Sequence, residues 1–236
     1  MSTTAVVHRR TVFAIIALAL LMMAIDATIV ATALPALQQG LGASINLAGW
    51  TITAYAFGFV LMLPVSGMLA QRYGKRRMFL ASTLAFTLAS LGCGLANDIH
   101  SLIVLRALQA AGGAGFTPTA TGIIVDHFGK SRDRYVSLFG SIFPLGAMIG
   151  PIFGGHIVEW FSWREVFFVN VPIGLLLLAL AWHFIPHDRR EARRQRTSFD
   201  LFGLILLGCS LLAGMLAVSV LGSPTAEEGG WQLSAV

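Results

Sequence analysis

The stretch AIDATIV, residues 24–30, decides the fold, because here a single carboxylate interrupts a long apolar run. No other charged side chain occurs between Thr11 and Leu34. A run of this length predicts a membrane-spanning helix, since about 20 apolar residues cross the hydrocarbon core of a bilayer. A carboxylate inside such a helix costs roughly 2.5–3.5 kcal/mol on insertion scales and normally faces a partner or a water-filled cavity. Asp26 is therefore the first candidate functional residue.

The composition indicates a membrane protein rather than a soluble domain. Of the 236 residues, 56% are hydrophobic and 11% are charged, whereas a soluble domain carries about 25% charged residues. The net charge of +5 does not indicate nucleic-acid binding, because the basic residues are confined to short loops, as the positive-inside rule describes. Cys93 and Cys209 lie far apart in apolar runs, so neither a disulfide framework nor a metal-binding spacing is expected.

Seven apolar runs are each long enough for a membrane-spanning helix. We expect these spans at about residues 11–34, 49–70, 78–97, 101–125, 136–158, 165–185 and 201–221. Every lysine and arginine except Arg106 and Arg164 falls in the connections on one side of the spans. That side is predicted to be cytoplasmic, with the N-terminus inside. The first span is too long for a signal peptide and lacks a cleavage site, so a retained helix is expected.

The expected fold class is an all-α membrane protein with a six-helix bundle and a seventh transmembrane helix. Residues 1–186 would form the bundle, residues 187–200 a basic cytoplasmic linker, and residues 201–236 the seventh helix and an external loop. A single helix after a closed bundle has no evident partner within the chain. We therefore interpret the sequence as the amino-terminal half of a longer, truncated protein.

Arg106 is the second ionisable side chain inside a predicted span. It lies about a turn inside the outer surface, and by the rise of an α-helix it sits within roughly one or two turns of the depth of Asp26. One interpretation is that Arg106 is the partner of the buried carboxylate. The alternative is that the arginine snorkels outward to the lipid headgroups.

Two glycine-containing motifs suggest conformational roles. Residues 146–155, GAMIGPIFGG, space small residues four apart around a proline. Small residues let helices approach closely, and Pro151 is expected to kink the span; the alternative is ordinary glycine-mediated packing. Residues 67–77, GMLAQRYGKRR, place Gly74 at a tight turn beside a basic cluster. The alternative role of this loop is a topology anchor at the headgroups.

Some apolar and polar side chains are candidates for a substrate pocket, with lipid-facing placement as the alternative for the apolar ones. These are Met22, Tyr55, Phe59 and Gln109. His183 and His187 have a spacing that can hold a metal, but nothing else converges there, so no metal and no other cofactor is expected. No nucleophile elbow, phosphate loop or paired catalytic carboxylates occur in the sequence, so the protein is not expected to be an enzyme.

Taken together, these motifs resemble the major facilitator superfamily. Residues 67–77 are similar to its signature loop. Residues 106–113, with Arg106 and Gln109, are similar to its span-four motif, and residues 146–155 to its span-five antiporter motif. Residues 25–35 and 163–174 resemble the first-span and sixth-span motifs of the fourteen-helix drug/proton antiporters within that superfamily.

The resemblance implies a role for each motif. Asp26 would be a protonation site, with Arg106 as its coupling partner. The residues that would form the antiporter helix and limit proton leak are Gly146, Gly150, Pro151, Gly154 and Gly155. The residues that would form a cytoplasmic gating loop are Gly67, Arg72, Gly74 and Arg76. The chain departs from the family patterns at Ala31, Gln71 and Ala110, where asparagine, an acidic residue and glycine are usual.

The function implied by the resemblance is proton-coupled efflux of amphipathic, often cationic drugs by alternating access. A proton gradient would drive this transport. The partners would be the drug, protons, the lipid bilayer of the bacterial inner membrane and a second transporter half, without nucleic acid. Two alternatives stay open: a facilitator for a single metabolite, and a non-transporting fragment or membrane interaction partner that needs a second half.

Overall fold

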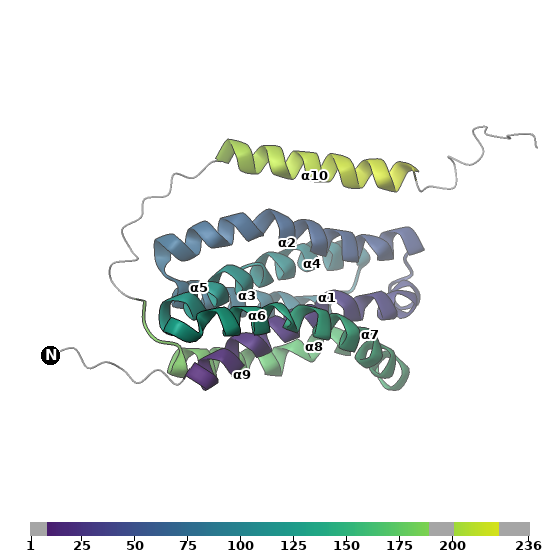
Figure 1. Cartoon of the computed structure of the whole chain (residues 1–236). Helices are drawn as coiled ribbons and strands as arrows, with labels where there is room; N and C mark the ends of the chain where they lie inside the picture. The colour runs from purple at the N-terminus through teal and green to yellow at the C-terminus, as the bar shows by residue number, and fades with distance from the viewer. Residues whose placement is uncertain (1–8, 189–200, 222–236) are drawn as a thin grey trace, which may run out of the picture. The chain divides into compact units, whose positions relative to one another are not determined.

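A computed structural model of the chain describes residues 9–188 and 201–221 (Figure 1). These residues form α-helices, one short 3₁₀ helix and connecting loops, and the described ranges contain no strand. The chain divides into two compact units, Met1–Ser198 and Phe199–Val236. The all-α fold class predicted from the sequence is confirmed.

The first unit is a bundle of helices joined by short turns. Its elements are α1 (Arg9–Leu41), α2 (Ile45–Tyr73), α3 (Lys75–Leu95), α4 (Ile99–Gly113), α5 (Phe116–His127), η1 (Gly129–Ser131), α6 (Arg132–Gly140), α7 (Ile142–Trp160), α8 (Glu165–Phe168) and α9 (Asn170–Phe184). The second unit contributes α10 (Leu201–Leu221). Each predicted span coincides with one helix or with a broken pair of helices.

Five helical segments of the described ranges are long and apolar enough to cross a membrane. They are Arg9–Leu41, Ile45–Tyr73, Lys75–Leu95, Gly129–Trp160 and Glu165–Phe184. The predicted fourth span is not among them, because it breaks at Ala114 and Gly115 into α4 and α5, which have 15 and 12 residues. α10 is a further apolar helix of 21 residues. The sequence therefore located the apolar segments but not the breaks at Ala114 and Gly115 and at Ser141.

Several helix boundaries follow from local side-chain chemistry. The Ser44 hydroxyl accepts a hydrogen bond from Leu47 N–H (3.3 Å) at the start of α2, and the Asp98 carboxylate accepts one from Ser101 N–H (2.9 Å) at the start of α4. Both satisfy backbone donors that a helix N-terminus leaves free. The hydrogen bond from Ser101 N–H lowers the pKa of the exposed Asp98 carboxyl group. Gly74 joins α2 to α3 at φ +101°, where glycine is favoured.

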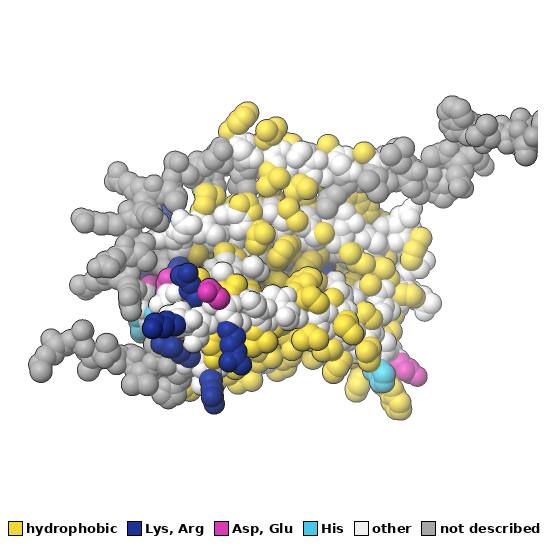
Figure 2. Space-filling view, viewed as in Figure 1, with side chains coloured by type: hydrophobic (Ala, Val, Ile, Leu, Met, Phe, Trp, Pro, Cys, Tyr) yellow, Lys and Arg dark blue, Asp and Glu magenta, His cyan; other side chains and the backbone are white. Residues whose placement is uncertain are grey.

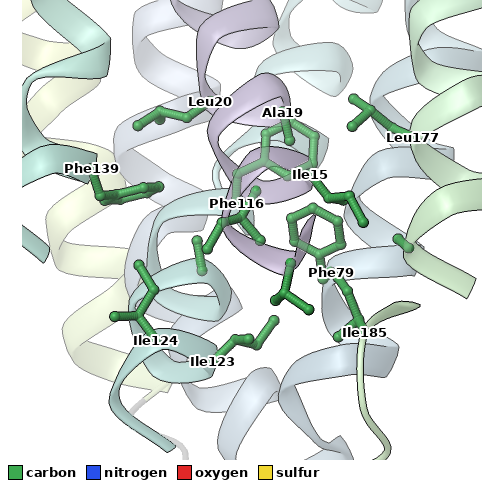
Figure 3. Close-up of a cluster of buried hydrophobic side chains, with 14 of the residues drawn as sticks. Ile15, Ala19, Leu20, Phe79, Phe116, Ile123, Ile124, Phe139, Leu177 and Ile185 are labelled. Carbon is green, nitrogen blue, oxygen red and sulfur yellow. The ribbon is translucent and has the colours of Figure 1, made fainter. Parts of the chain in front are cut away.

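Two clusters of buried apolar side chains pack around α1. In the first cluster, the Phe116 ring of α5 contacts the rings of Phe79 and Phe86 of α3, with centroids 5.7 and 5.8 Å apart. Figure 3 shows side chains of α1, α3, α5, α6 and α9 converging there. The second cluster surrounds the later part of α1 at Ile29 and Leu37. α1 is therefore the central helix of the first unit, which places Asp26 in its interior.

The surface of the first unit is apolar along the helices and charged at the ends. Figure 2 shows lysine and arginine side chains gathered at one end, with hydrophobic side chains over the flank. Exposed apolar residues include Leu88, Leu108 and Met148, as expected of helices that face lipid tails. Trp160 and Trp182 are also exposed, which is typical of aromatic residues at a membrane interface.

Candidate functional site

The two ionisable side chains predicted inside the spans form an ion pair in the interior of the first unit. Arg106 Nη1 donates to Asp26 Oδ2 at 2.7 Å, and both side chains are 0% exposed. Arg106 Nη2 also donates to the Asp26 backbone carbonyl at 3.5 Å. Asp26 is the only buried carboxylate of the described ranges. Arg106 therefore does not snorkel outward; its guanidinium is turned toward the carboxylate.

Three polar side chains complete the hydrogen bonding around the ion pair. Asp26 Oδ1 accepts from Gln109 Nε2 at 2.9 Å and from Asn170 Nδ2 at 2.7 Å. Both amide groups also donate to Ser90 Oγ at 3.0 Å, and the Ser90 hydroxyl donates to the Phe167 carbonyl at 2.9 Å. Both carboxylate oxygens thus have strong donors, as a buried charge requires.

Four helices supply this network. Its members are Asp26 on α1, Ser90 on α3, Arg106 and Gln109 on α4, and Asn170 on α9. Arg106 and Gln109 are three residues apart and share one face of α4, and Arg106 Nη1 donates to Gln109 Oε1 at 2.7 Å. Asn170 is the first residue of α9, directly after the break that separates this helix from α8. The break therefore positions a carboxamide beside the carboxylate.

An aromatic ring covers the guanidinium. Arg106 Cζ lies 4.1 Å from the centroid of the Tyr55 ring of α2 and 5.5 Å from that of the Phe167 ring. A cation over an aromatic face is attracted by the ring quadrupole. Arg106 Nε has no hydrogen-bond partner among the described residues, and neither has the buried Tyr55 hydroxyl. The ring therefore supplies part of the stabilisation that additional hydrogen bonds would otherwise give the arginine.

The predicted antiporter segment packs α7 closely against α1. A Cβ atom on any of three glycines would overlap an α1 side chain. The three glycines and their α1 neighbours are Gly146 with Ala24, Gly150 with Thr28, and Gly154 with Thr32. Glycine is therefore needed at these positions for the two helices to approach so closely. Asp26 lies between the first two of these contacts along α1.

The other two residues predicted in this segment have different surroundings. A Cβ atom at Gly155 would have nothing within 4 Å, and Pro151 is exposed. Neither residue takes part in the close glycine contact with α1. α7 continues through Pro151, and the interruption in this span lies at Ser141, between α6 and α7. The kink expected at Pro151 stays a prediction.

The predicted gating loop contacts the segment that follows α9. A Cβ atom at Gly74 would overlap the Asp188 carboxylate, and Arg76 N–H donates to Asp188 Oδ1 at 3.1 Å. The Arg76 guanidinium donates to the Trp182 carbonyl and lies 5.5 Å from the Trp182 ring centroid. Asp188 therefore brings a carboxylate to a loop in which Gln71 occupies the usually acidic position.

The neighbouring loop residues lie at the junction of α2 and α5. Lys75 Nζ donates to Asp126 Oδ2 at 2.7 Å and to the Gly122 carbonyl at 3.1 Å. Gly67 lines an open cleft of about 530 Å³ together with Lys75 and residues of α5. Arg72 is exposed, and its Cζ lies 5.5 Å from the centroid of the neighbouring Tyr73 ring. The basic loop thus makes specific contacts with α5 and with the end of α9.

A small apolar groove of about 230 Å³ lies among α1, α2 and α7. Of the predicted pocket residues, Tyr55 and Phe59 line it. The remaining lining residues are Met23, Ala27, Ile52, Ala56, Val60 and Phe143. Met22 belongs instead to the buried cluster around α1, and Gln109 donates to Asp26.

The predicted histidine pair has no metal-binding arrangement. His183 and His187 are both exposed, and the His183 ring packs edge-on against Phe184 with centroids 4.8 Å apart. No group of three or more histidine, cysteine or acidic side chains in the described ranges is placed to hold a metal ion.

Two members of the network were missed by sequence reasoning. The position of Asn170 indicated a polar partner, since a carboxamide inside an apolar span is costly unless it is hydrogen-bonded. The position of Ser90 did not, because serine in a helix commonly bonds to its own backbone. The ion pair itself was the interaction that the sequence indicated most directly.

The match to a known family covers most of the chain. Residues 16–236 match the family model described as Major Facilitator Superfamily. The chain belongs to the major facilitator superfamily. The assignment from the sequence motifs is therefore confirmed, and membership of this superfamily indicates a transporter. The family, its bacterial multidrug relatives and the apolar helices identify a multi-pass protein of the bacterial inner membrane.

Curated relatives of this chain include proteins named for multidrug resistance or multidrug transport. The Multidrug resistance protein B homolog of Mycobacterium tuberculosis is 37% identical over 203 residues, covering 86% of this chain and 37% of the relative. The Multidrug transporter protein MdtP of Bacillus subtilis is 34% identical over 220 residues, covering 92% of this chain and 39% of the relative. The chain thus spans less than half the length of these relatives.

Solved structures of transporters share this fold at low sequence identity. A D-xylose-proton symporter aligns with a TM-score of 0.69 and 16% identity, covering 89% of this chain and 53% of the symporter. The human organic anion transporter MFSD10 aligns with a TM-score of 0.66 and 16% identity, covering 85% of this chain and 53% of that transporter. At these identities the likeness concerns the fold alone.

Proposed function

We propose that this chain is the amino-terminal half of a proton-coupled multidrug efflux antiporter. In this proposal residues 1–186 form its first six-helix bundle, residues 187–200 a cytoplasmic linker, and residues 201–236 a seventh transmembrane helix and external loop. Residues 189–200 of the linker and 222–236 of the loop lie outside the described residues. The observation that carries the proposal is the Asp26–Arg106 ion pair, at 2.7 Å and fully buried in an apolar bundle. Ionisable side chains at such depth are typical of proton relays in transporters. The multidrug relatives support drugs as the substrates.

The proton-coupling step takes place at Asp26. In the deprotonated form, the carboxylate accepts hydrogen bonds from Arg106, Gln109 and Asn170. Protonation removes the charge of Asp26 and weakens its contact with the Arg106 guanidinium. Arg106 then keeps its cation–π contact with the Tyr55 ring and its hydrogen bond to the Gln109 side-chain oxygen. Drug leaves the cell in exchange for protons that enter, by rocking of two halves about a site near the middle of the membrane.

The two glycine-containing motifs support this exchange. The α7 glycines hold α7 against the face of α1 behind Asp26, and in this position α7 limits proton leak past the carboxylate. The residues that gate the cytoplasmic end are Gly67, Arg72, Gly74 and Arg76. Asp188 restrains that loop through Arg76. A second transporter half supplies the other wall of the pathway.

Drug-induced proton release from the complete transporter in detergent tests the proposal. Asp26→Asn is expected to abolish proton release while the purified protein keeps its elution volume on size exclusion. Arg106→Ala is expected to abolish exchange, whereas Arg106→Lys keeps a small part of it because the positive charge is retained. Undiminished exchange by Asp26→Asn would remove Asp26 from the mechanism. Flux of a single metabolite without proton exchange would favour a facilitator.

A further inference from the structure

The Tyr55 ring borders both the ion pair and the apolar groove. Arg106 Cζ lies 4.1 Å from its centroid, which is the range of a strong cation–π contact. The same side chain lines the groove among α1, α2 and α7. It is 6% exposed, and its buried hydroxyl has no partner among the described residues. One aromatic side chain therefore separates the groove from the arginine that holds Asp26.

A glycine on α2 makes this arrangement possible. Gly58 lies one turn after Tyr55, and a Cβ atom on Gly58 would overlap the backbone carbonyl of Ala107. α2 and α4 therefore approach closely at the turn that contains Arg106. This approach brings the Tyr55 ring to the guanidinium and leaves no space for a side chain between them. Their contact is a consequence of the helix packing.

The lining of the groove suits an aromatic organic cation. Its lining includes the aromatic residues Tyr55, Phe59 and Phe143 and carries no charged side chain. Aromatic faces attract cations, and three aromatic side chains line this groove. The lining residue Ala27 directly follows Asp26 of the charged network in the sequence.

We propose that Tyr55 couples occupancy of this groove to the Asp26–Arg106 pair, with an aromatic organic cation as the ligand. The inference rests on the function proposed above and names the residue through which drug and proton communicate. Tyr55 acts as a positioning residue for the proton exchange, because its ring holds the Arg106 guanidinium by a cation–π contact when the groove is empty. A drug cation on the same ring competes with Arg106 for the negative charge of the ring face.

The competition has a defined consequence for the proton. Two cations held by one ring, each about 4 Å from its centroid, are separated by about 8 Å, and their repulsion at an effective dielectric of about 20 corresponds to roughly a 30-fold change in an equilibrium. The second cation therefore weakens the hold of the ring on Arg106, whose Nη1 already lies 2.7 Å from Asp26 Oδ2, and the added positive charge favours the ionised carboxylate. The O–H bond of protonated Asp26 breaks, the proton leaves to water, and the carboxylate keeps the electron pair and accepts from Arg106.

The titratable groups around Asp26 are few. They are Tyr55 from α2, Cys93 from α3 and Arg106 from α4. α9 contributes the neutral Asn170 and α7 the neutral glycines. Tyrosine and cysteine ordinarily keep their protons near neutral pH, so Asp26 is the group whose proton the experiment tests. Asp26→Asn is the control for this assignment.

The experiment compares two aromatic residues of the groove in the complete transporter in detergent. Tetraphenylphosphonium is the probe, because it is an aromatic cation without hydrogen-bonding groups. Its binding and the protons released per bound molecule are measured at saturation for the wild type and variants. Tyr55→Leu removes the ring beside Arg106, and Phe59→Leu removes a groove ring for which no contact with Arg106 is seen. Tyr55→Phe keeps the ring and removes only the hydroxyl.

The expected results separate binding from coupling. Phe59→Leu should weaken binding several-fold and keep the wild-type number of protons per bound cation. Tyr55→Leu should also weaken binding, but it should release less than about half of that number, whereas Tyr55→Phe should behave as the wild type. If Tyr55→Leu does not fold, Tyr55→Met serves the same comparison, because it fills the space without a ring.

Two outcomes would overturn the inference, and they differ from failure of the proposed function. Equal proton release per bound cation in Tyr55→Leu and Phe59→Leu would show that the ring does not couple the two sites. Loss of coupling in Tyr55→Phe would assign the effect to the hydroxyl instead. If the wild type binds the cation without any proton release, the proposed antiport fails, and the coupling role of Tyr55 fails with it.

Discussion

Removing Arg106 alone should destabilise the protein more than removing both members of the ion pair. Arg106→Met keeps most of the length of the side chain and deletes the charge, which leaves the Asp26 carboxylate buried without its cation. The double variant Asp26→Asn/Arg106→Met leaves no buried charge. Both side chains are 0% exposed, so solvent cannot replace the missing partner in the single variant.

The size of the effect follows from the geometry. Breaking a buried pair by deleting one partner costs roughly 3–5 kcal/mol, whereas replacing both partners with neutral groups is often near neutral. Asp26 keeps the donors Gln109 and Asn170, at 2.9 and 2.7 Å, so we expect about 3 kcal/mol for Arg106→Met and within about 1 kcal/mol for the double variant. At roughly 2–4 °C per kcal/mol for a chain of this size, the single variant should melt about 6–12 °C lower.

Thermal unfolding of the purified protein in detergent at pH 7 measures this difference, with all variants scanned at one rate because such unfolding is commonly irreversible. Equal losses for the single and double variants would refute the reasoning, because the cost would then come from packing rather than from an unpaired carboxylate.

Three further outcomes are expected. Gly150→Val should lower the melting temperature by overpacking α7 on α1, at about 1–3 kcal/mol, whereas the matched change Gly155→Val, with nothing within 4 Å of a Cβ there, should leave it nearly unchanged. Asn170→Ala should cost about 1.5–3 kcal/mol in the same assay by removing a donor to a charged carboxylate; no change would mean that a water replaces the amide. Asp98→Ala should destabilise the protein at pH 7. The pKa of Asp98 in the folded protein is lowered from its ordinary value of 3.8. Its carboxylate therefore contributes fully to the stability of the folded protein above pH 3.8, and this contribution is lost as the pH falls through the lowered pKa. Melting curves at neutral and strongly acidic pH check the difference.

The charged residues of the site could be predicted because each carries a large energetic penalty in an apolar span. A carboxylate and a guanidinium at compatible depths have few alternatives to pairing, and Asp26 and Arg106 pair as that argument indicates. The glycine spacing of α7 was informative for the same kind of reason. Glycines four residues apart form a smooth helix face, and that face lies against α1.

Other features depend on the packing of elements far apart in the sequence. The break between α4 and α5 has no proline at Ala114 or Gly115, so the apolar pattern continues through it. Met22 and Met23 are adjacent and chemically identical, yet only Met23 lines the groove, because one residue is a rotation of about 100° around a helix. Asp188 follows α9 in sequence, and its contact with the loop at Gly74 is set by tertiary structure.

Helix geometry links the ion pair to the glycine contact. Ala24, Thr28 and Thr32 repeat every four residues along α1 and face the α7 glycines, whereas Asp26 lies about 200° around the helix from Ala24 and from Thr28. A movement of α1 that separates Asp26 from Arg106 must therefore also change the contact with α7. Because the α7 face lacks interlocking side chains, α1 can slide along it without unpacking the bundle. A bulky residue at Gly150 should consequently slow proton exchange even though it touches neither charged side chain.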